Sequence, residues 1–274
     1  MNQTFSFKRF GTYFKYDLTQ MWRNHSRAAI LIGGASAIFY ILWVLFSLVF
    51  AQEWHSPMIE ARAIMFVIAF LILELYQVKT YGHLTEKKAG SSWLMIPASR
   101  AEKFVSMLLI TLIVIPLLFL AVYGIIDGFL SLVDPTYGKA LAVGFAEVYT
   151  KMIEGLAEIN GQIDVNLNPA TMIIMGIISF VGNFLYFLLC GVCFKRNKLV
   201  AAFAILFAFS VLMSVVMGFV GPALVENWPN DVEWTEDMFV SWTNGLMTLS
   251  VTLSILMAVG FGWGIWYRIK TLQH

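Results

Sequence analysis

The chain has 274 residues, of which 59% are hydrophobic and only 13% are charged, and its mean hydropathy is +0.75. Soluble domains carry about 25% charged residues, so this composition excludes an ordinary soluble protein and indicates an all-α integral membrane protein with one membrane domain, 1–274. The net charge is +1. There is no run of lysines and arginines with interleaved aromatic residues, so we expect no nucleic-acid partner.

The N-terminal segment, 1–26, has the pattern of an interfacial helix over residues 4–26. Aromatic and aliphatic residues recur at three- and four-residue spacing, and basic residues lie off that stripe. A helix with one aromatic face and one basic face is typical of a helix lying on the bilayer surface. The alternative is an ordinary flanking helix packed on protein.

Six runs are long enough to cross a bilayer, which requires about 20 apolar residues per helix. These predicted spans are Ala28–Phe50, Ala63–Val78, Val105–Ile126, Thr171–Phe194, Leu199–Val220 and Leu246–Trp266.

The distribution of basic residues predicts the orientation of these spans. With the N-terminus inside, 15 of the 18 lysines and arginines fall in inner segments, and Arg62, Lys139 and Lys151 fall in outer ones. Short cytoplasmic loops carry an excess of Lys and Arg. The sequence therefore predicts six spans with both termini inside.

Two outer segments are longer than turns. Residues 134–169 contain an amphipathic helical pattern between the third and fourth spans, which predicts an outer helix that either caps a transport route or only covers the bundle. Residues 221–244 contain Trp228, Trp234 and Trp242, and tryptophans at the headgroup level are expected membrane anchors.

The chain lacks the common catalytic motifs. It has no GxxxxGK[ST] for a nucleoside triphosphate, no HExxH and no GxSxG. Cys190 and Cys193 form a CxxC at the inner end of the fourth span, without the two further soft ligands that a zinc site requires. Two apolar thiols on one helix face are the preferred interpretation.

Two polar residues fall inside predicted spans. Glu74 is an intramembrane carboxylate, which is costly and by default indicates a function. It lies about 7 Å along the helix from Lys79 at about 1.5 Å per residue, so we favour a structural or coupling role over a proton relay. Asn183 in the fourth span is expected to bond a neighbouring helix.

The best-specified feature is the basic loop at 82–103, between the second and third spans. Ser99 and Glu102 have the spacing of a capping box, in which each side chain bonds the backbone N–H of the other residue. Pro97 disfavours helix at the residue before it. We therefore expect a rigid elbow at the start of the third span, preceded by a short helix and an apolar patch at residues 93–96 that needs cover.

These features together resemble the permease subunit of ABC-2-type ABC transporters. Members of that family have six spans, an amphipathic N-terminal helix and a cytoplasmic coupling helix between the second and third spans. The stretch WLMIPASRAEKF is similar to the LP-S-x-x-E segment of short bacterial permeases. The resemblance implies a multi-pass protein of the bacterial inner membrane, embedded in lipid and paired with a second permease chain.

The resemblance also implies a mechanism and roles for individual residues. A separate ATPase subunit would bind ATP and Mg²⁺, so that no cofactor is expected on this chain, and the coupling helix would transmit its movement to the spans. The ATPase would face Thr85, Glu86, Lys87, Lys88 and Gly90. Movement would pass to the third span through Pro97, Ser99 and Glu102, and the exported substrate would be hydrophobic or amphipathic.

Two other classes of function remain open on the sequence. A stand-alone carrier or channel would transport without an ATPase and would depend on Glu74. A non-transporting membrane protein, such as an assembly factor or an intramembrane enzyme, would bring polar residues together at one depth, and the spans offer few of them.

Overall fold

The computed structural model describes residues 5–162, 169–226 and 236–271, and these residues are helical, without strands. The helices are α1 (Phe7–Gly33), α2 (Ala35–Phe50), α3 (Ile59–Thr80), the 3₁₀ turn η1 (Gly82–Thr85), α4 (Lys87–Met95), α5 (Arg100–Leu109), the π-helical turn η2 (Ile110–Val114), α6 (Ile115–Val133), α7 (Leu141–Gln162), α8 (Pro169–Cys193), α9 (Lys198–Glu226) and α10 (Glu236–Thr271).

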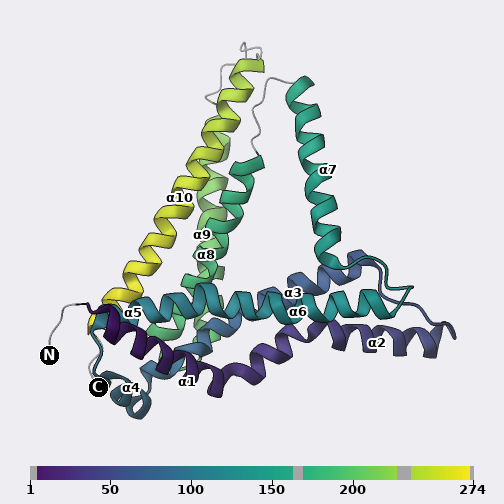
Figure 1. Cartoon of the computed structure of the whole chain (residues 1–274). Helices are drawn as coiled ribbons and strands as arrows, with labels where there is room; N and C mark the ends of the chain where they lie inside the picture. Colours follow the sequence, from purple (N-terminus) through teal and green to yellow (C-terminus); the bar gives the residue numbers. More distant parts are fainter. Residues whose placement is uncertain (1–4, 163–168, 227–235, 272–274) are drawn as a thin grey trace.

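The helices form two groups that meet at one end and diverge towards the other (Figure 1). The first group, lying flat in this view, contains α1, α2, α3 and the continuous run α5–η2–α6. The second contains α8, α9 and α10, which stand upright. The first turns of α1, the last turns of α10 and the short helix α4 lie at the end where the groups meet, and α7 rises from the far end of the first group.

The break between the N-terminal helix and the first predicted span is at Gly34, and the expected boundary near residue 27 was wrong. Helix α1 runs unbroken to Gly33, and α2 follows at a bend of 40°. A Cβ at Gly33 would lie 2.9 Å from the side chain of Val122 in α6. The two glycines therefore allow the helix to approach α6 closely and then to change direction, because neither carries a side chain.

The third predicted span contains an irregular turn where its sequence requires one. Pro116 lies at the start of α6 and has no N–H to donate to the preceding turn. The π-helical turn η2 lies immediately before it, and π-turns within α-helices commonly accommodate such interruptions. The whole run Arg100–Val133 is longer than the predicted Val105–Ile126 and begins at the elbow.

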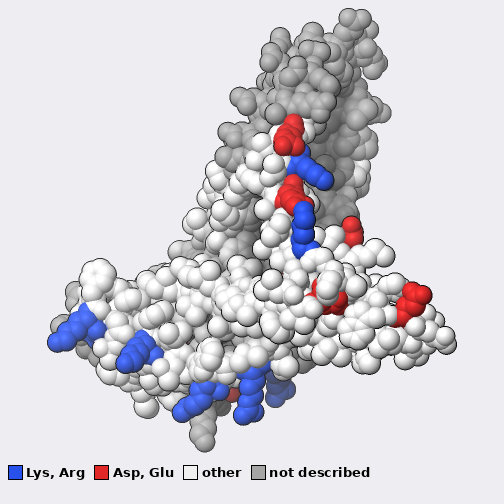
Figure 2. Space-filling view, turned by 45° about the vertical axis from the view of Figure 1, so that its right-hand side comes forward, with Lys and Arg blue, Asp and Glu red and all other residues white. Residues whose placement is uncertain are grey.

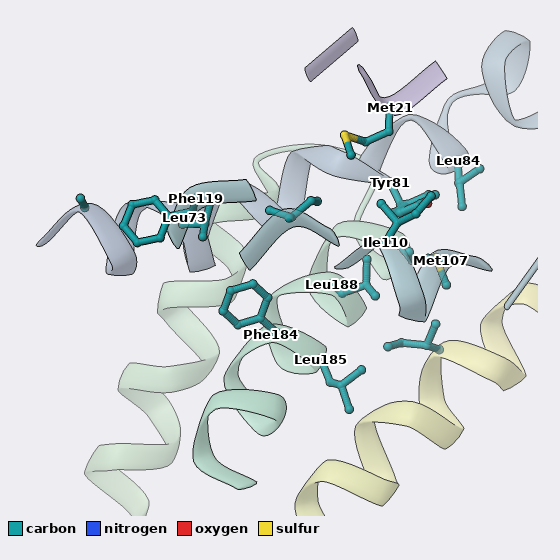
Figure 3. Packing of buried hydrophobic residues seen from close by; sticks show 14 of the residues in the cluster. Met21, Leu73, Tyr81, Leu84, Met107, Ile110, Phe119, Phe184, Leu185 and Leu188 are labelled. Atoms are coloured by element: carbon teal, nitrogen blue, oxygen red, sulfur yellow. The ribbon is translucent and has the colours of Figure 1, made fainter. Parts of the chain in front are cut away.

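The two groups are joined by packing between α3 and α8. Leu73 from α3, together with Phe184 and Leu188 from α8, is fully buried in a shared core (Figure 3). Further along, a Cβ at Gly191 would lie 2.5 Å from the backbone oxygen of Val78. A glycine is required there because the two backbones are in direct contact.

Four stretches among the described residues are long and apolar enough to cross a membrane, and the bent pair α1–α2 adds a fifth if it counts as one span. The four stretches are Arg100–Val133, Ile173–Cys193, Lys198–Val216 and Met247–Thr271. The chain is therefore a multi-pass helical membrane protein. The second predicted span falls in α3, which is not in this set, so six spans and their orientation stay predictions.

Charged side chains are separated on the face shown in Figure 2. Lysines and arginines gather at the left and along the lower edge. Acidic residues lie towards the opposite end of the flat group and along α7, where basic side chains lie among them. The positive-inside rule predicts that lysines and arginines gather on one side of a membrane protein, and the distribution on this face agrees with that rule.

Both segments that were predicted to lie outside, 134–169 and 221–244, contain helix in their described parts. The predicted helix within 134–169 is confirmed as α7, which contacts α3 and α6 and rises from the far end of the flat group in Figure 1. In the segment 221–244, α9 continues to Glu226 and α10 starts at Glu236. Trp228 and Trp234 lie outside the described residues.

Candidate functional site

The predicted elbow is present at the start of α5. The Ser99 hydroxyl accepts a hydrogen bond from the Glu102 backbone N–H at 3.2 Å, and the Ser99 N–H donates to Glu102 Oε2 at 2.8 Å. The capping box is thus confirmed. Helix α4 ends at Met95 and the next residue, Ile96, is extended, as Pro97 requires of its predecessor.

Glu102 is also clamped by the first turn of α1. The Arg9 guanidinium donates from Nη2 to Oε1 at 2.6 Å and from Nε to Oε2 at 2.7 Å. The Ser6 backbone N–H donates to Oε1 at 2.8 Å. The Glu102 side chain is fully buried, whereas 33% of the Arg9 side chain is exposed. A two-point contact between guanidinium and carboxylate fixes orientation as well as distance, so α1 and the elbow are held as one unit.

The apolar patch before the elbow is covered by α1 and by the elbow itself. Trp93 is 6% exposed, and its indole N–H donates to the Tyr13 hydroxyl at 3.0 Å. The Lys103 ammonium donates to the backbone oxygen of Trp93 at 2.8 Å and to that of Leu94 at 3.3 Å. It also lies 4.6 Å from the centre of the Trp93 ring. Met95, by contrast, is 80% exposed.

The five residues expected to face an ATPase differ in their exposure. Glu86 is exposed, but Thr85 is only 5% exposed and donates to the backbone oxygen of Gly82 at 3.0 Å. Gly90 is buried as well. The side chains of Lys87 and Lys88 lie outside the described part. The surface that a second protein can touch here is therefore narrower than the sequence suggested.

The residues expected to transmit movement also divide into two kinds. Pro97 is exposed at the tip of the elbow, whereas Ser99 and Glu102 are buried beneath it. Among the described residues expected to act in coupling and those of the apolar patch, Glu86, Met95 and Pro97 are exposed, and the buried capping box links the elbow to α5 and α1.

The two polar residues predicted inside spans lie on α3 and α8, the helices that join the two groups. Glu74 in α3 is 5% exposed, whereas Asn183 in α8 is exposed and lies near the Glu74 carboxyl group. The expected bond from Asn183 to a neighbouring helix and the expected coupling role of Glu74 both stay predictions.

A buried ion pair at the far end of the first group was missed by the sequence reasoning. Arg62 in α3 and Asp127 in α6 lie 3.1 Å apart, with side chains 2% and 3% exposed. Asp127 also accepts from the Tyr137 hydroxyl at 2.8 Å and from the Leu141 N–H, the first residue of α7, at 2.6 Å. The sequence did contain one signal of this pair. Asp127 is an acidic residue directly after a predicted apolar span, in a chain with few basic residues in its predicted outer segments.

A second carboxylate at the same end of the first group ties the loop after α2 to the end of α6. Asp134 accepts hydrogen bonds from the Tyr40 hydroxyl at 2.8 Å, the Trp54 indole at 3.2 Å, the Ser56 hydroxyl, and both the N–H and hydroxyl of Thr136. Burial acts to raise the pKa of Asp134, but these donors outweigh it and hold the pKa well below its usual range.

Metal chemistry receives no support from the described residues. They contain no group of three or more His, Cys, Asp or Glu side chains arranged to hold a metal ion. Cys190 is buried and Cys193 exposed, and both are free thiols. No protein-family model, curated protein or solved structure matches the chain. Its function must therefore be argued from its own geometry.

Proposed function

We propose that the chain is the membrane-spanning permease subunit of an ATP-driven exporter of the ABC-2 type. It would export a hydrophobic or amphipathic substrate across the bacterial inner membrane. The observation that carries the proposal is the elbow: a capping box at Ser99 and Glu102, clamped to α1 through Arg9, beneath exposed contact points at Met95 and Pro97.

In this proposal the energy source lies on another chain, which agrees with the lack of a nucleotide-binding motif in the sequence. An ATPase subunit would bind ATP and Mg²⁺ and would press on α4 and the tip of the elbow. Of the residues first expected to face it, we retain Glu86 as an exposed contact. We add Met95, whose side chain is largely exposed at the end of α4.

Force applied at the tip of the elbow has a defined route into the membrane helices. Ser99 and Glu102 fix the first turn of α5, and Arg9 fixes the first turn of α1 to the same carboxylate. Displacing the elbow would therefore move α5 and α1 together. Rigid elements joined by hydrogen-bond networks are the expected carriers of such coupling.

The substrate route would form with a second copy of the chain or a related permease. The described parts of α9 and α10 carry many exposed apolar side chains, among them Phe207 at 72% and Val259 at 64%. Lipid or a second permease chain would cover such faces, and a hydrophobic or amphipathic substrate is compatible with them.

A stand-alone carrier is the second candidate, because the buried carboxyl group of Glu74 lies on α3, one of the two helices that join the helix groups. Intramembrane carboxylates of this kind mark proton and ion pathways in transporters. Uptake into proteoliposomes that contain the purified chain alone, abolished by Glu74→Gln, would favour this candidate over the permease.

The proposal is tested by co-expressing the tagged chain with an ATPase encoded beside its gene. We expect Mg²⁺-dependent ATP hydrolysis to co-purify with the chain and to be absent from the chain purified alone. Met95→Asp should remove the ATPase from the complex, since it puts a charge on the contact surface. Met58→Asp is the matched control, because Met58 is 71% exposed on a distant loop. Retention of the ATPase by Met95→Asp would contradict the assigned surface.

A further inference from the structure

A small cavity lies between α1 and the end of α3, and the proposed function gives it no role. Its volume is about 100 Å³, and its walls come from α1, from residues 80–83 and from the end of α4. Met21 and Tyr81, two of its lining residues, are seen together in Figure 3. The cavity can hold a group of a few heavy atoms.

One carboxylate supplies the formal charge of the cavity wall. Asp17 is 8% exposed, and its Oδ2 accepts from the Tyr81 hydroxyl at 3.0 Å and from the Ser106 hydroxyl at 2.6 Å. Both bonds end on the same oxygen, and the described residues give Oδ1 no hydrogen bond. None of the ion pairs among described side chains includes Asp17.

Two other buried acids have a cation partner that Asp17 lacks. Glu102 is paired with Arg9 and Asp127 with Arg62, whereas Asp17, like the buried Glu74 and Asp134, is in no ion pair among the described side chains. A buried carboxylate without a cation is costly, and its cost falls when a positive group occupies the adjacent space.

The remaining described wall residues suit a cation that carries N–H donors. Gln20 and Asn24 lie one and two turns along α1 from Asp17 and supply amide oxygens, and no lysine or arginine lines the cavity. Burial lowers the pKa of His83, so its ring is predominantly neutral at pH 7 and can accept a hydrogen bond. Tyr16 and Trp93 add aromatic surface, which favours organic cations over strongly hydrated metal ions.

We propose that this cavity binds a primary ammonium or guanidinium group, held by Asp17 Oδ1 and by the amide oxygens of Gln20 and Asn24. An anionic ligand is disfavoured because the formal charge on the described wall is negative. The group is either a free small amine or the end of a lysine or arginine side chain from another protein. The inference does not depend on the proposed transport function.

Thermal unfolding of the purified full chain in detergent tests the inference. Methylammonium chloride at about 100 times its Kd should raise Tm by about 5 °C. Potassium chloride and choline chloride at equal ionic strength should leave it unchanged, because neither cation carries an N–H donor. Absence of a methylammonium shift, or an equal shift with potassium, overturns the assignment.

Two variants test whether the rise in Tm with methylammonium results from binding in this cavity. Asp17→Asn should weaken methylammonium binding at least tenfold, whereas Glu60→Gln, an exposed acid near the start of α3, should not. If Asp17→Asn fails to fold, Asn24→Tyr takes its place, because Asn24 is exposed and a larger side chain fills the cavity from its rim. Full binding in Asp17→Asn, or in Asn24→Tyr, contradicts the proposal.

The two sources of the group are separated by comparing ligands. A tripeptide with a central lysine that binds about tenfold more tightly than methylammonium indicates the side chain of a protein partner. Equal or weaker binding of the tripeptide indicates a free amine. Both outcomes support the binding of an ammonium or guanidinium group in this cavity.

Discussion

Removing one member of the buried Arg62–Asp127 pair should destabilise the protein strongly, and removing Asp127 should cost more than removing Arg62. Breaking a buried ion pair by removing one partner costs about 3–5 kcal/mol. Asp127→Leu leaves Arg62 with one backbone acceptor, the Lys139 oxygen at 2.8 Å, and with the Tyr137 ring at 4.0 Å. Its Nε already lacks a partner, and a guanidinium cannot shed its charge.

Arg62→Met should cost less, because Asp127 keeps two donors. The Tyr137 hydroxyl and the Leu141 N–H still bond its carboxyl oxygens, and a carboxylate can be neutralised by taking up a proton. We therefore expect Asp127→Leu to lower Tm by about 10 °C, at about 2–4 °C per kcal/mol. Arg62→Met should lower it by less.

The double variant Arg62→Met/Asp127→Leu completes the experiment. Removing both charges removes the unpaired group, so its Tm should lie above that of Asp127→Leu alone. The exposed pair Lys139–Glu147 is the matched control, and Glu147→Gln should leave Tm unchanged. This reasoning would be refuted if the Tm of the double variant lay below those of both single variants. It would also be refuted if Arg62→Met lowered Tm more than Asp127→Leu does.

Two further predictions concern the contact between α3 and α8 and the loop that follows α6. Gly191→Leu should lower Tm sharply, since its Cβ would lie 2.5 Å from the Val78 oxygen, whereas Gly182→Ala, which has open space around it, should have little effect. The depressed pKa of Asp134 stabilises the folded state above the ordinary pKa of an aspartate, about 4. That contribution is lost as the pH falls through the lower folded value. Asp134→Asn should therefore flatten the decline in Tm between pH 5 and pH 3, and an unchanged decline would contradict the assignment.

Local sequence patterns predicted the parts of the structure that depend on local contacts. The capping box at Ser99, the end of helix before Pro97 and the amphipathic helix that begins at Leu141 each follow from residues within a few positions of one another. Such signals need no knowledge of the rest of the fold.

Contacts between distant residues could not be predicted in the same way. Arg9 and Glu102 are 93 positions apart, and Arg62 and Asp127 are 65 apart. A basic residue on an interfacial helix is compatible with lipid headgroups, so nothing in the sequence indicated that Arg9 would bond a carboxylate. The break at Gly34 was misplaced for a related reason, because the position of the bend depends on packing against α6.

The arrangement of the two helix groups also lay beyond the sequence. Hydropathy indicates which segments are apolar, but it does not specify the angle at which they pack. The close approach of Gly191 to Val78 and the shared core of Leu73, Phe184 and Leu188 determine where the groups meet. These contacts are recognisable only once α3 and α8 are known to be neighbours.

The most direct measurement of the central claim is the mobility of a spin label at position 100, on the exposed first residue of α5. In a chain whose native Cys190 and Cys193 are replaced by alanine, Arg100→Cys carries the label in the assembled complex, and Trp54→Cys, on the loop after α2, carries the control label. The account predicts that ATP and vanadate change the mobility at position 100 only when the ATPase subunit is present. The same change in the chain alone, or no change in the complex, would contradict it.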